Sequence, residues 1–277
     1  MIKYQVKLTS ASFQFIFFVL TGIILNACNN GDNPGETNGT TTNLSEPKTL
    51  SHSIIKAFPH DTGSYTQGLT FYKGELYEGT GLEGHSKLMK VELESGKILQ
   101  QIKLANEIFG EGIAILRDTI YQLTWKNKVV YVYTLKDFKK VKEFQIATEG
   151  WGITHDGTKL IVSTGSGDLY FYDPSTFRLL SKSGIMEGGN LTFNLNELEY
   201  IDGFVYANQF TYPYILKIDP VEGKVVAKYN LNDIWDRVRA INPLVDVPNG
   251  IAYNELTKKI YVTGKLWPEL YEIQLSQ

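Results

Sequence analysis

The stretch Glu111-Gly112-Ile113-Ala114 decides the fold, because four variants of it recur along the chain. The five copies, in chain order, are Gln67-Gly68-Leu69-Thr70, Glu111-Gly112-Ile113-Ala114, Trp151-Gly152-Ile153-Thr154, Glu197-Leu198-Glu199 and Asn249-Gly250-Ile251-Ala252. Counted from positions 68, 112, 152, 197 and 250, the steps between copies are 44, 40, 45 and 53 residues. A period of about 40–50 residues is typical of a propeller, in which each repeat is one blade of four strands.

Each copy is followed by further short apolar runs, which are separated by Gly, Asp, Asn and Pro turns. Second and third runs are clear in all five repeats, and fourth runs are clearest at residues 96–99 and 223–226. Because no fourth run follows Ile273, we expect residues 53–58 to supply the outer strand of the last blade and to close the ring. The sequence therefore predicts an all-β fold, a five-bladed β-propeller of four-stranded antiparallel blades over residues 53–277, which leaves only short edges exposed.

Composition agrees with one large β domain. The 277 residues are 43% hydrophobic and 21% charged, enough to bury one substantial core, and they include 25 Gly and 17 Tyr but only three Met. A short helix is expected only at residues 231–240, where Asn232 or Asp233 would cap it and Pro243 would end it. The 27 basic and 30 acidic residues give a net charge of −3, which offers no basic excess for phosphates and argues against nucleic acid as a partner.

The N-terminus has the features of a signal peptide. Lys3 and Lys7 precede an apolar run at residues 13–25, which is too short for the roughly 20 residues that a membrane-spanning helix needs. The run ends in Leu25-Asn26-Ala27-Cys28, which resembles a bacterial lipobox; an ordinary cleavage site beside an unrelated cysteine is the alternative. We expect a lipoprotein signal peptide over residues 1–27 and lipid on Cys28. The protein would then lie at the cell envelope, facing the periplasm or the outer membrane, and would contact the membrane through the lipid only.

Residues 28–52 are expected to form a flexible tether. They are rich in Asn, Gly, Thr and Pro and contain few large apolar side chains, so burial cannot offset the entropy lost on ordering. Fully extended, such a tether reaches about 75 Å, which would hold the domain clear of a lipid surface.

Propeller geometry predicts where chemistry gathers. The first strand of each blade lines the central channel and runs antiparallel to the second, so one mouth collects the starts of first strands and the ends of second strands. The side chains expected there are Gln67, Glu111, Trp151, Asn196 and Asn249 from the starts, and Thr80, Trp125, Thr164, Phe210 and Lys265 from the ends. A carboxylate, an ammonium, amides and aromatic rings around one cavity are typical of a binding site.

These residues also have plainer interpretations. Glu111 and Lys265 could be surface charges, Trp125 and Trp151 hydrophobic plugs of the channel, and the amides of Gln67 and Asn196 partners for blade loops. The glycines on both sides of Glu111 allow close backbone approach and favour a functional role for that residue.

Other chemistries have little support. His52, His60, His85 and His155 show no metal-ligand spacing and the one cysteine lies outside the domain, so we expect no metal site and no cofactor. Gly165-Ser166-Gly167-Asp168 lies between two predicted strands rather than between a strand and a helix, which argues against a phosphate-binding loop.

Five motifs resemble those of the plant and bacterial glutaminyl cyclotransferases. They are Phe109-Gly110-Glu111-Gly112, Gln122-Leu123-Thr124-Trp125, Glu149-Gly150-Trp151-Gly152, Leu195-Asn196-Glu197-Leu198-Glu199-Tyr200 and Val262-Thr263-Gly264-Lys265-Leu266-Trp267-Pro268. The segment Tyr65-Thr66-Gln67-Gly68-Leu69 fits the opening motif of the family, and the matches continue in order to about Ile273.

The resemblance implies a metal-independent, five-bladed enzyme that converts the N-terminal Gln of peptides or proteins to pyroglutamate and releases ammonia. It implies catalytic roles for Glu111 and Lys265, and substrate binding by Gln67, Trp125, Trp151 and Asn196. Phe210 is also expected to bind substrate, although the family often has Trp there. A non-catalytic propeller that binds a partner at the cell envelope is the main alternative, a metal-dependent propeller hydrolase is the next, and a monomer is expected.

Overall fold

The computed structural model describes residues 46–276. The expected signal peptide (residues 1–27), Cys28 and the expected tether as far as residue 45 lie outside the described residues. The last part of the expected tether is folded, because Lys48–Leu50 forms strand β1 and β2 begins at His52. β1 is held by backbone pairing, which does not require large apolar side chains. No helix in the described range is long and apolar enough to cross a membrane.

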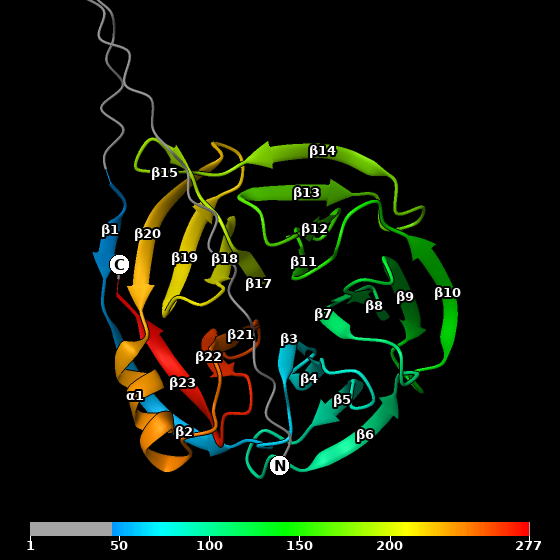
Figure 1. Cartoon of the computed structure of the whole chain (residues 1–277), viewed down its shortest axis with the longest axis horizontal. Coiled ribbons are helices and arrows are strands. Elements are labelled where there is room, and N and C mark those ends of the chain that lie inside the picture. The colour runs from blue at the N-terminus through cyan, green and yellow to red at the C-terminus, as the bar shows by residue number, and fades with distance from the viewer. Residues whose placement is uncertain (1–45, 277) are drawn as a thin grey trace, which may run out of the picture. The chain divides into compact units, whose positions relative to one another are not determined.

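The described residues form a β-propeller whose sheets are arranged around a common centre (Figure 1). Four sheets have four strands each, and neighbouring strands within them are antiparallel. Two of them, read outward from the centre, are β3 (Thr66–Tyr72), β4 (Glu75–Thr80), β5 (Lys87–Val91) and β6 (Ile98–Lys103), then β7 (Gly110–Leu116), β8 (Thr119–Thr124), β9 (Val129–Thr134) and β10 (Lys140–Gln145). The other two are β11 (Ile153–His155), β12 (Leu160–Val162), β13 (Asp168–Tyr172) and β14 (Leu179–Gly184), then β21 (Pro248–Asn254), β22 (Lys259–Gly264), β23 (Glu269–Leu275) and β2 (His52–Pro59).

The ring is closed by pairing between the two ends of the domain. β2 runs antiparallel to β23, with Phe58 opposite Leu270 and Ile54 opposite Ile273. This confirms the prediction that residues 53–58 supply the outer strand of the last repeat.

The fourth repeat belongs to a larger sheet than the sequence predicted. Its strands β17 (Leu195–Ile201), β18 (Phe204–Gln209), β19 (Tyr214–Asp219) and β20 (Lys224–Asn230) pair antiparallel in chain order. The outer strand β20 also pairs with β1 and with β15 (Met186–Glu187), which forms a hairpin with β16 (Asn190–Leu191). The sheet therefore has seven strands instead of four, because β1 and β15 bond to backbone groups that an outer strand leaves unpaired.

The inner strands of neighbouring sheets pack against each other with their backbones almost in contact. A Cβ added to Gly112 would lie 2.7 Å from the carbonyl oxygen of Trp151, and one added to Gly152 would lie 2.0 Å from that of Asn196. Only glycine allows this approach, which explains why it recurs in the repeat. In the fourth copy, Glu197 replaces glycine, and its carboxylate accepts hydrogen bonds from Leu69 N (3.2 Å) and Ile251 N (2.8 Å).

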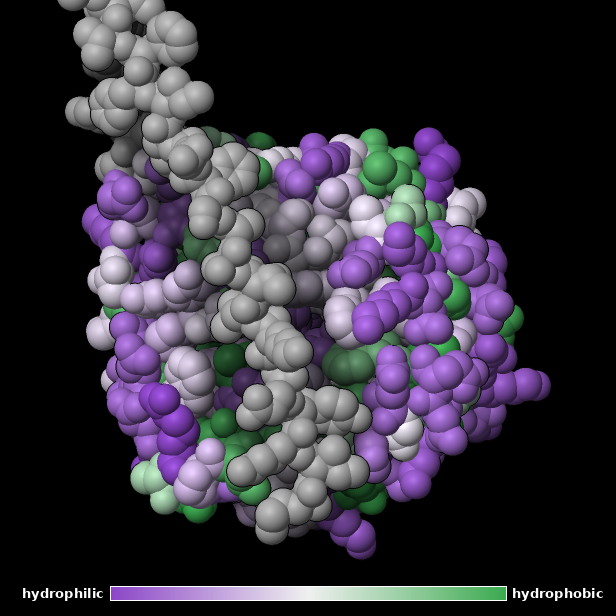
Figure 2. Space-filling view, viewed as in Figure 1, coloured by the Kyte–Doolittle hydropathy of each residue, from purple (hydrophilic) through white to green (hydrophobic). Residues whose placement is uncertain are grey.

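The core consists of apolar clusters that are shared by neighbouring sheets. One cluster contains Tyr229 and Tyr271, and another contains Leu123 and Leu160. The outer strands β6 and β10 are largely exposed, and hydrophilic residues cover this side of the molecule (Figure 2).

The predicted helix is present as α1 (Asn232–Ile241), which buries Ile234 and Val238. The predicted cap is wrong, because neither Asn232 nor Asp233 caps the helix with its side chain. Instead, the N–H of Asn232 donates to Oδ1 of Asn230 at 2.9 Å.

Candidate active site

One cavity of about 290 Å³ brings together all seven catalytic and substrate-binding residues that the sequence predicted. Its lining consists of Gln67, Glu111, Trp125, Trp151, Asn196, Phe210 and Lys265, together with Tyr65 and Phe109. The lining residues lie at or just before strand starts, as Glu111 in β7 does, or follow strand ends, as Lys265 does after β22. Antiparallel pairing brings these ends to one mouth of the channel.

Three other residues expected at this mouth do not line the cavity. Asn249 is fully buried, and its Nδ2 donates to Oε1 of Gln67 at 3.1 Å, so it supports a lining residue. The hydroxyl groups of the two threonines form hydrogen bonds with nearby residues instead. Thr80 accepts from Lys87 N, and Thr164 pairs with Ser166 Oγ.

Glu111 is a buried carboxyl group that lacks a full set of partners. Its side chain is 4% exposed, and Oε2 has no hydrogen-bond partner among the described residues. Burial raises the pKa of Glu111 well above its usual value, the positive charge of Lys265 opposes that rise, and the negative charge of Glu149 adds to it. A buried carboxyl group with a raised pKa is suited to accept and return a proton during a reaction.

Lys265 lies in an aromatic setting. Its Nζ is 4.7 Å from the ring centroid of Tyr65 and 5.0 Å from that of Phe210, distances at which a cation is attracted to the ring faces. Burial lowers the pKa of Lys265, while the charges of Glu111 and Asp246 oppose the shift. The site therefore holds one acid and one base whose pKa values are moved toward each other.

The walls of the cavity are aromatic. Phe109 meets Trp125 edge to face with 5.5 Å between ring centroids, and Trp151 meets Phe210 in the same way at 5.6 Å. Glu149 Oε2 accepts hydrogen bonds from Nε1 of Trp125 (2.7 Å) and Nε1 of Trp151 (3.4 Å). One carboxylate thus orients both indoles.

Asp246 fixes the opposite side of the cavity. Its Oδ2 accepts a 2.8 Å hydrogen bond from the hydroxyl group of Tyr65, and its backbone N–H donates to the carbonyl oxygen of Lys265 at 2.9 Å. Nε1 of Trp267 donates to the backbone oxygen of Asp246 at 2.9 Å. These bonds tie Tyr65 to the turn that carries Lys265.

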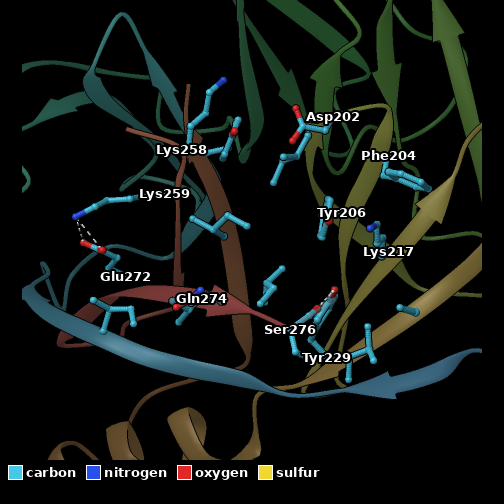
Figure 3. Close-up of a pocket in the computed structure, with 18 of the residues that line it drawn as sticks. Asp202, Phe204, Tyr206, Lys217, Tyr229, Lys258, Lys259, Glu272, Gln274 and Ser276 are labelled. Atoms are coloured by element: carbon cyan, nitrogen blue, oxygen red, sulfur yellow. Dashed lines mark hydrogen bonds and ion pairs between the residues drawn. The ribbon is translucent and has the colours of Figure 1, made fainter. Parts of the chain in front are cut away.

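A larger cavity, of about 950 Å³, lies between the seven-stranded sheet and the sheet of β21–β23 (Figure 3). Several of its polar groups pair with one another: Lys259 Nζ lies 2.9 Å from Glu272 Oε1, and the Tyr229 hydroxyl donates to Ser276 O at 3.1 Å. None of the buried polar atoms that lack a partner in the described chain belongs to it, whereas Glu111 and Asn196 of the smaller cavity both carry one. The smaller cavity is therefore the candidate active site.

Among residues 46–276, no group of three or more His, Cys, Asp or Glu side chains is arranged to hold a metal ion. Metal independence of the reaction stays a prediction, and its basis is the set of proton-transferring and hydrogen-bonding side chains in the cavity.

Comparison with known proteins decides the family. The family described as glutamine cyclotransferase matches residues 25–275. The chain belongs to this family. It is 35% identical over 246 residues to a glutaminyl-peptide cyclotransferase of Arabidopsis thaliana, a match that covers 88% of this chain and 77% of the relative.

A solved structure gives the same result for the fold. The crystal structure of Myxococcus xanthus glutaminyl cyclase superposes with a TM-score of 0.78 at 33% identity, over 83% of this chain and 99% of that one. The resemblance expected from the sequence motifs is confirmed.

Sequence reasoning missed four residues of this glutamine cyclotransferase site: Tyr65 and Phe109 in the lining, and Glu149 and Asp246 behind it. Three of the four stand two positions before a predicted residue, in the pairs Tyr65/Gln67, Phe109/Glu111 and Glu149/Trp151. Side chains two apart in an extended chain point to the same face, so this spacing could have found them. Asp246 is in a loop with no such signal.

Proposed function

We propose that this protein is a glutaminyl-peptide cyclotransferase, which converts the N-terminal Gln of peptides or proteins to pyroglutamate and releases ammonia. The observation that carries the proposal is the buried carboxyl group of Glu111, with its raised pKa, in the same aromatic cavity as Lys265. Membership of the glutamine cyclotransferase family supports the same activity.

The cavity suits a single Gln residue. At about 290 Å³ it lies at the small end of ligand pockets, and most of its wall is aromatic. Glu111 Oε2 and Asn196 Oδ1 are buried acceptors without partners in the described chain, and a substrate amine and side-chain amide would supply the donors they lack. The indoles of Trp125 and Trp151 would hold the Gln side chain folded over its own amine.

Glu111 is assigned the role of proton shuttle. The α-amine of a peptide has a pKa near 7.7–8.0, so at neutral pH it must lose a proton before it can attack. The neutral amine nitrogen forms a bond to Cδ of its own side chain, and the Cδ–Nε2 bond breaks. Glu111 takes the proton from the attacking nitrogen and delivers it to Nε2, which leaves as ammonia.

Lys265 and Asn196 are assigned to the oxygen of the tetrahedral intermediate. The Cδ carbonyl oxygen becomes negatively charged as the ring closes, and donors already fixed in place stabilise that charge. The ammonium of Lys265 lies over the rings of Tyr65 and Phe210 and lines the same cavity as Glu111, where its N–H groups can donate to this oxygen.

We also assign five blades to the propeller and count the seven-stranded sheet as the fourth blade in chain order. Support comes from β17–β20, which pair antiparallel in chain order like the strands of the first three blades. In this assignment β1, β15 and β16 are additions to the edge of that blade.

The proposed location is the cell envelope, with the chain cleaved before Cys28 and anchored through lipid on that cysteine. The basis is the sequence alone: two lysines, an apolar run and the lipobox-like Leu25-Asn26-Ala27-Cys28. Cys28→Ala should release the protein from the membrane fraction, and a variant that stays as firmly bound as the parent would exclude this anchor.

The activity is tested by incubating the purified protein with a Gln-initiated peptide and measuring released ammonia. The matched control is the same peptide acetylated at its N-terminus, which lacks the nucleophile. Ammonia from the first peptide alone supports the proposal. If neither peptide yields ammonia while the protein is folded, the propeller is a binding module instead of an enzyme.

A further inference from the structure

An exposed aromatic pair lies next to the cavity, and the chemistry described above does not use it. Phe193 is 47% exposed and Tyr212 is 40% exposed, and their ring centroids are 5.6 Å apart. Neighbouring large apolar side chains on a surface mark interaction sites. We propose that this pair, Phe193 and Tyr212, is the rim pair that binds the side chain of the residue following Gln and favours an aromatic residue there. This inference rests on the proposed function.

The rim pair is hydrogen-bonded to the segment that carries Phe210, a residue of the cavity wall. The N–H of Phe210, a lining residue, donates to the carbonyl oxygen of Asn194 at 2.8 Å, and Asn194 Nδ2 donates back to Phe210 O at 3.3 Å. Gln209 is the residue before Phe210 in the chain. Its Nε2 donates to Phe193 O at 3.1 Å, and Tyr212 N donates to Gln209 O at 3.0 Å. The two segments that carry the rim pair therefore form one unit with Phe210.

The backbone of this unit adopts a rare conformation on both segments. Asn194 has φ of 57° and Thr211 has φ of 70°, in the left-handed region that a β-branched residue such as Thr rarely enters. Residues of this kind persist only where the surrounding structure enforces them, so the two turns fix the backbone that carries the rim pair. The left-handed turns lie directly beside the rim pair, Asn194 after Phe193 and Thr211 before Tyr212.

The path of the substrate leads to the rim. Because the amine and the side chain of Gln must both lie inside the cavity, the Gln carbonyl group has to lead the rest of the peptide out through the mouth. One residue of extended chain spans about 3.3–3.6 Å, so the next side chain emerges at the rim. On the side of Trp125, Lys126 places its ammonium 4.2 Å from the indole centroid, whereas on the side of Phe210 the chain carries Tyr212 two positions further on, in contact with Phe193.

The test compares two peptides on one protein, Gln-Phe-Ala and Gln-Gly-Ala, by kcat/KM for ammonia release. The parent should prefer the Phe peptide by about three- to tenfold, the size of an aromatic contact. The double variant Phe193→Ser with Tyr212→Ser should bring this ratio close to one. Leu256→Ser, at a 73% exposed position in the turn between β21 and β22, is the matched control and should keep the ratio of the parent.

Each outcome decides the proposal. The ratio does not depend on how much of a preparation is folded, and each single variant repeats the comparison if the double variant does not fold. Equal kcat/KM for both peptides in the parent, or an unchanged preference in the variants, overturns the proposal that the rim pair binds the second residue. The proposed function stands in that case. If the parent releases no ammonia from either peptide, the proposed function is wrong, and the proposed role of the rim pair is wrong with it.

Discussion

The indole Nε1 of Trp125 donates a 2.7 Å hydrogen bond to Oε2 of Glu149. The same oxygen accepts a second bond from Nε1 of Trp151, although the two tryptophans flank strands of different sheets, Trp125 after β8 and Trp151 before β11. The charge of Glu149 also raises the pKa of Glu111. A residue outside the cavity lining therefore positions both indoles of the cavity and adds to the rise that burial causes in the pKa of its carboxyl group.

Substitution of Glu149 should affect binding and pH dependence separately. Glu149→Ala removes a charged acceptor, and hydrogen bonds to charged groups contribute about 1.5–3 kcal/mol, so kcat/KM should fall by about tenfold or more. Glu149→Gln removes a negative charge that raises the pKa of Glu111, so the acid limb of the kcat profile should move to lower pH. Glu143→Ala, at an exposed residue paired with Lys140, is the control. An acid limb that does not move would show that Glu149 has no electrostatic effect on catalysis.

Glu111→Gln should keep the shape of the side chain and abolish proton transfer. Because general acid–base catalysis contributes about 10²–10⁴-fold, kcat should fall by at least that factor while KM changes little. Steady-state kinetics on a Gln-initiated peptide measure both quantities, with Glu107→Gln as the exposed control on the same segment. A folded Glu111→Gln variant with a near-parental rate would remove Glu111 from the mechanism.

Lys265→Ala should raise the barrier by roughly 3 kcal/mol, the effect of losing one oxyanion donor. Because Lys265 lowers the pKa of Glu111, its loss should also move the acid limb of kcat to higher pH, opposite to the shift in Glu149→Gln. In the parent, the alkaline limb should lie below the usual lysine pKa of 10.5, since burial lowers the pKa of Lys265. Lys258→Ala, at an exposed position, controls for loss of a positive charge. An acid limb that moves the other way would contradict this placement of the two charges.

Glu199 should make the domain less stable as pH rises. Its Oε1 accepts a 2.8 Å hydrogen bond from Tyr253 N, and burial raises its pKa well above the usual value of 4.5. The unfolded chain loses this proton near pH 4.5 while the folded protein retains it, so stability declines as pH rises from there through the raised pKa. Glu199→Gln keeps an acceptor and cannot titrate, so urea unfolding between about pH 5 and pH 8 should show a flatter decline than in the parent. Identical slopes would exclude Glu199 as a source of the pH dependence.

Turnover should survive exhaustive chelation, because the proposed chemistry uses only Glu111 and neutral or cationic donors of the cavity. The measurement is ammonia release after dialysis against a chelator, compared with a mock-dialysed sample. Activity that disappears and returns only on addition of zinc would refute a metal-independent mechanism.

The sequence by itself was sufficient for the repeat, the all-β architecture and most of the cavity. Period-two alternation is a local property, and the glycines of the inner strands, such as Gly112 and Gly152, mark the positions where backbones meet. Because antiparallel strands alternate direction, strand starts and ends could be assigned to one mouth without coordinates, and this placed Glu111 near Lys265 despite their distance in the chain.

Only the tertiary structure decided which strands pair at the outer edge of the seven-stranded sheet and how the pKa values of the cavity residues shift. β1 pairs with β20 through Lys48–Ala227 and Leu50–Tyr229, and such pairing uses backbone groups that every residue has, so side-chain patterns do not reveal it. Likewise, the hydrogen bonds of Glu149 and Asp246 depend on where separate segments meet. The pKa values of Glu111 and Lys265 depend on burial and on charges from distant parts of the chain, because the energy of a charge is set by the surroundings that the fold builds around it.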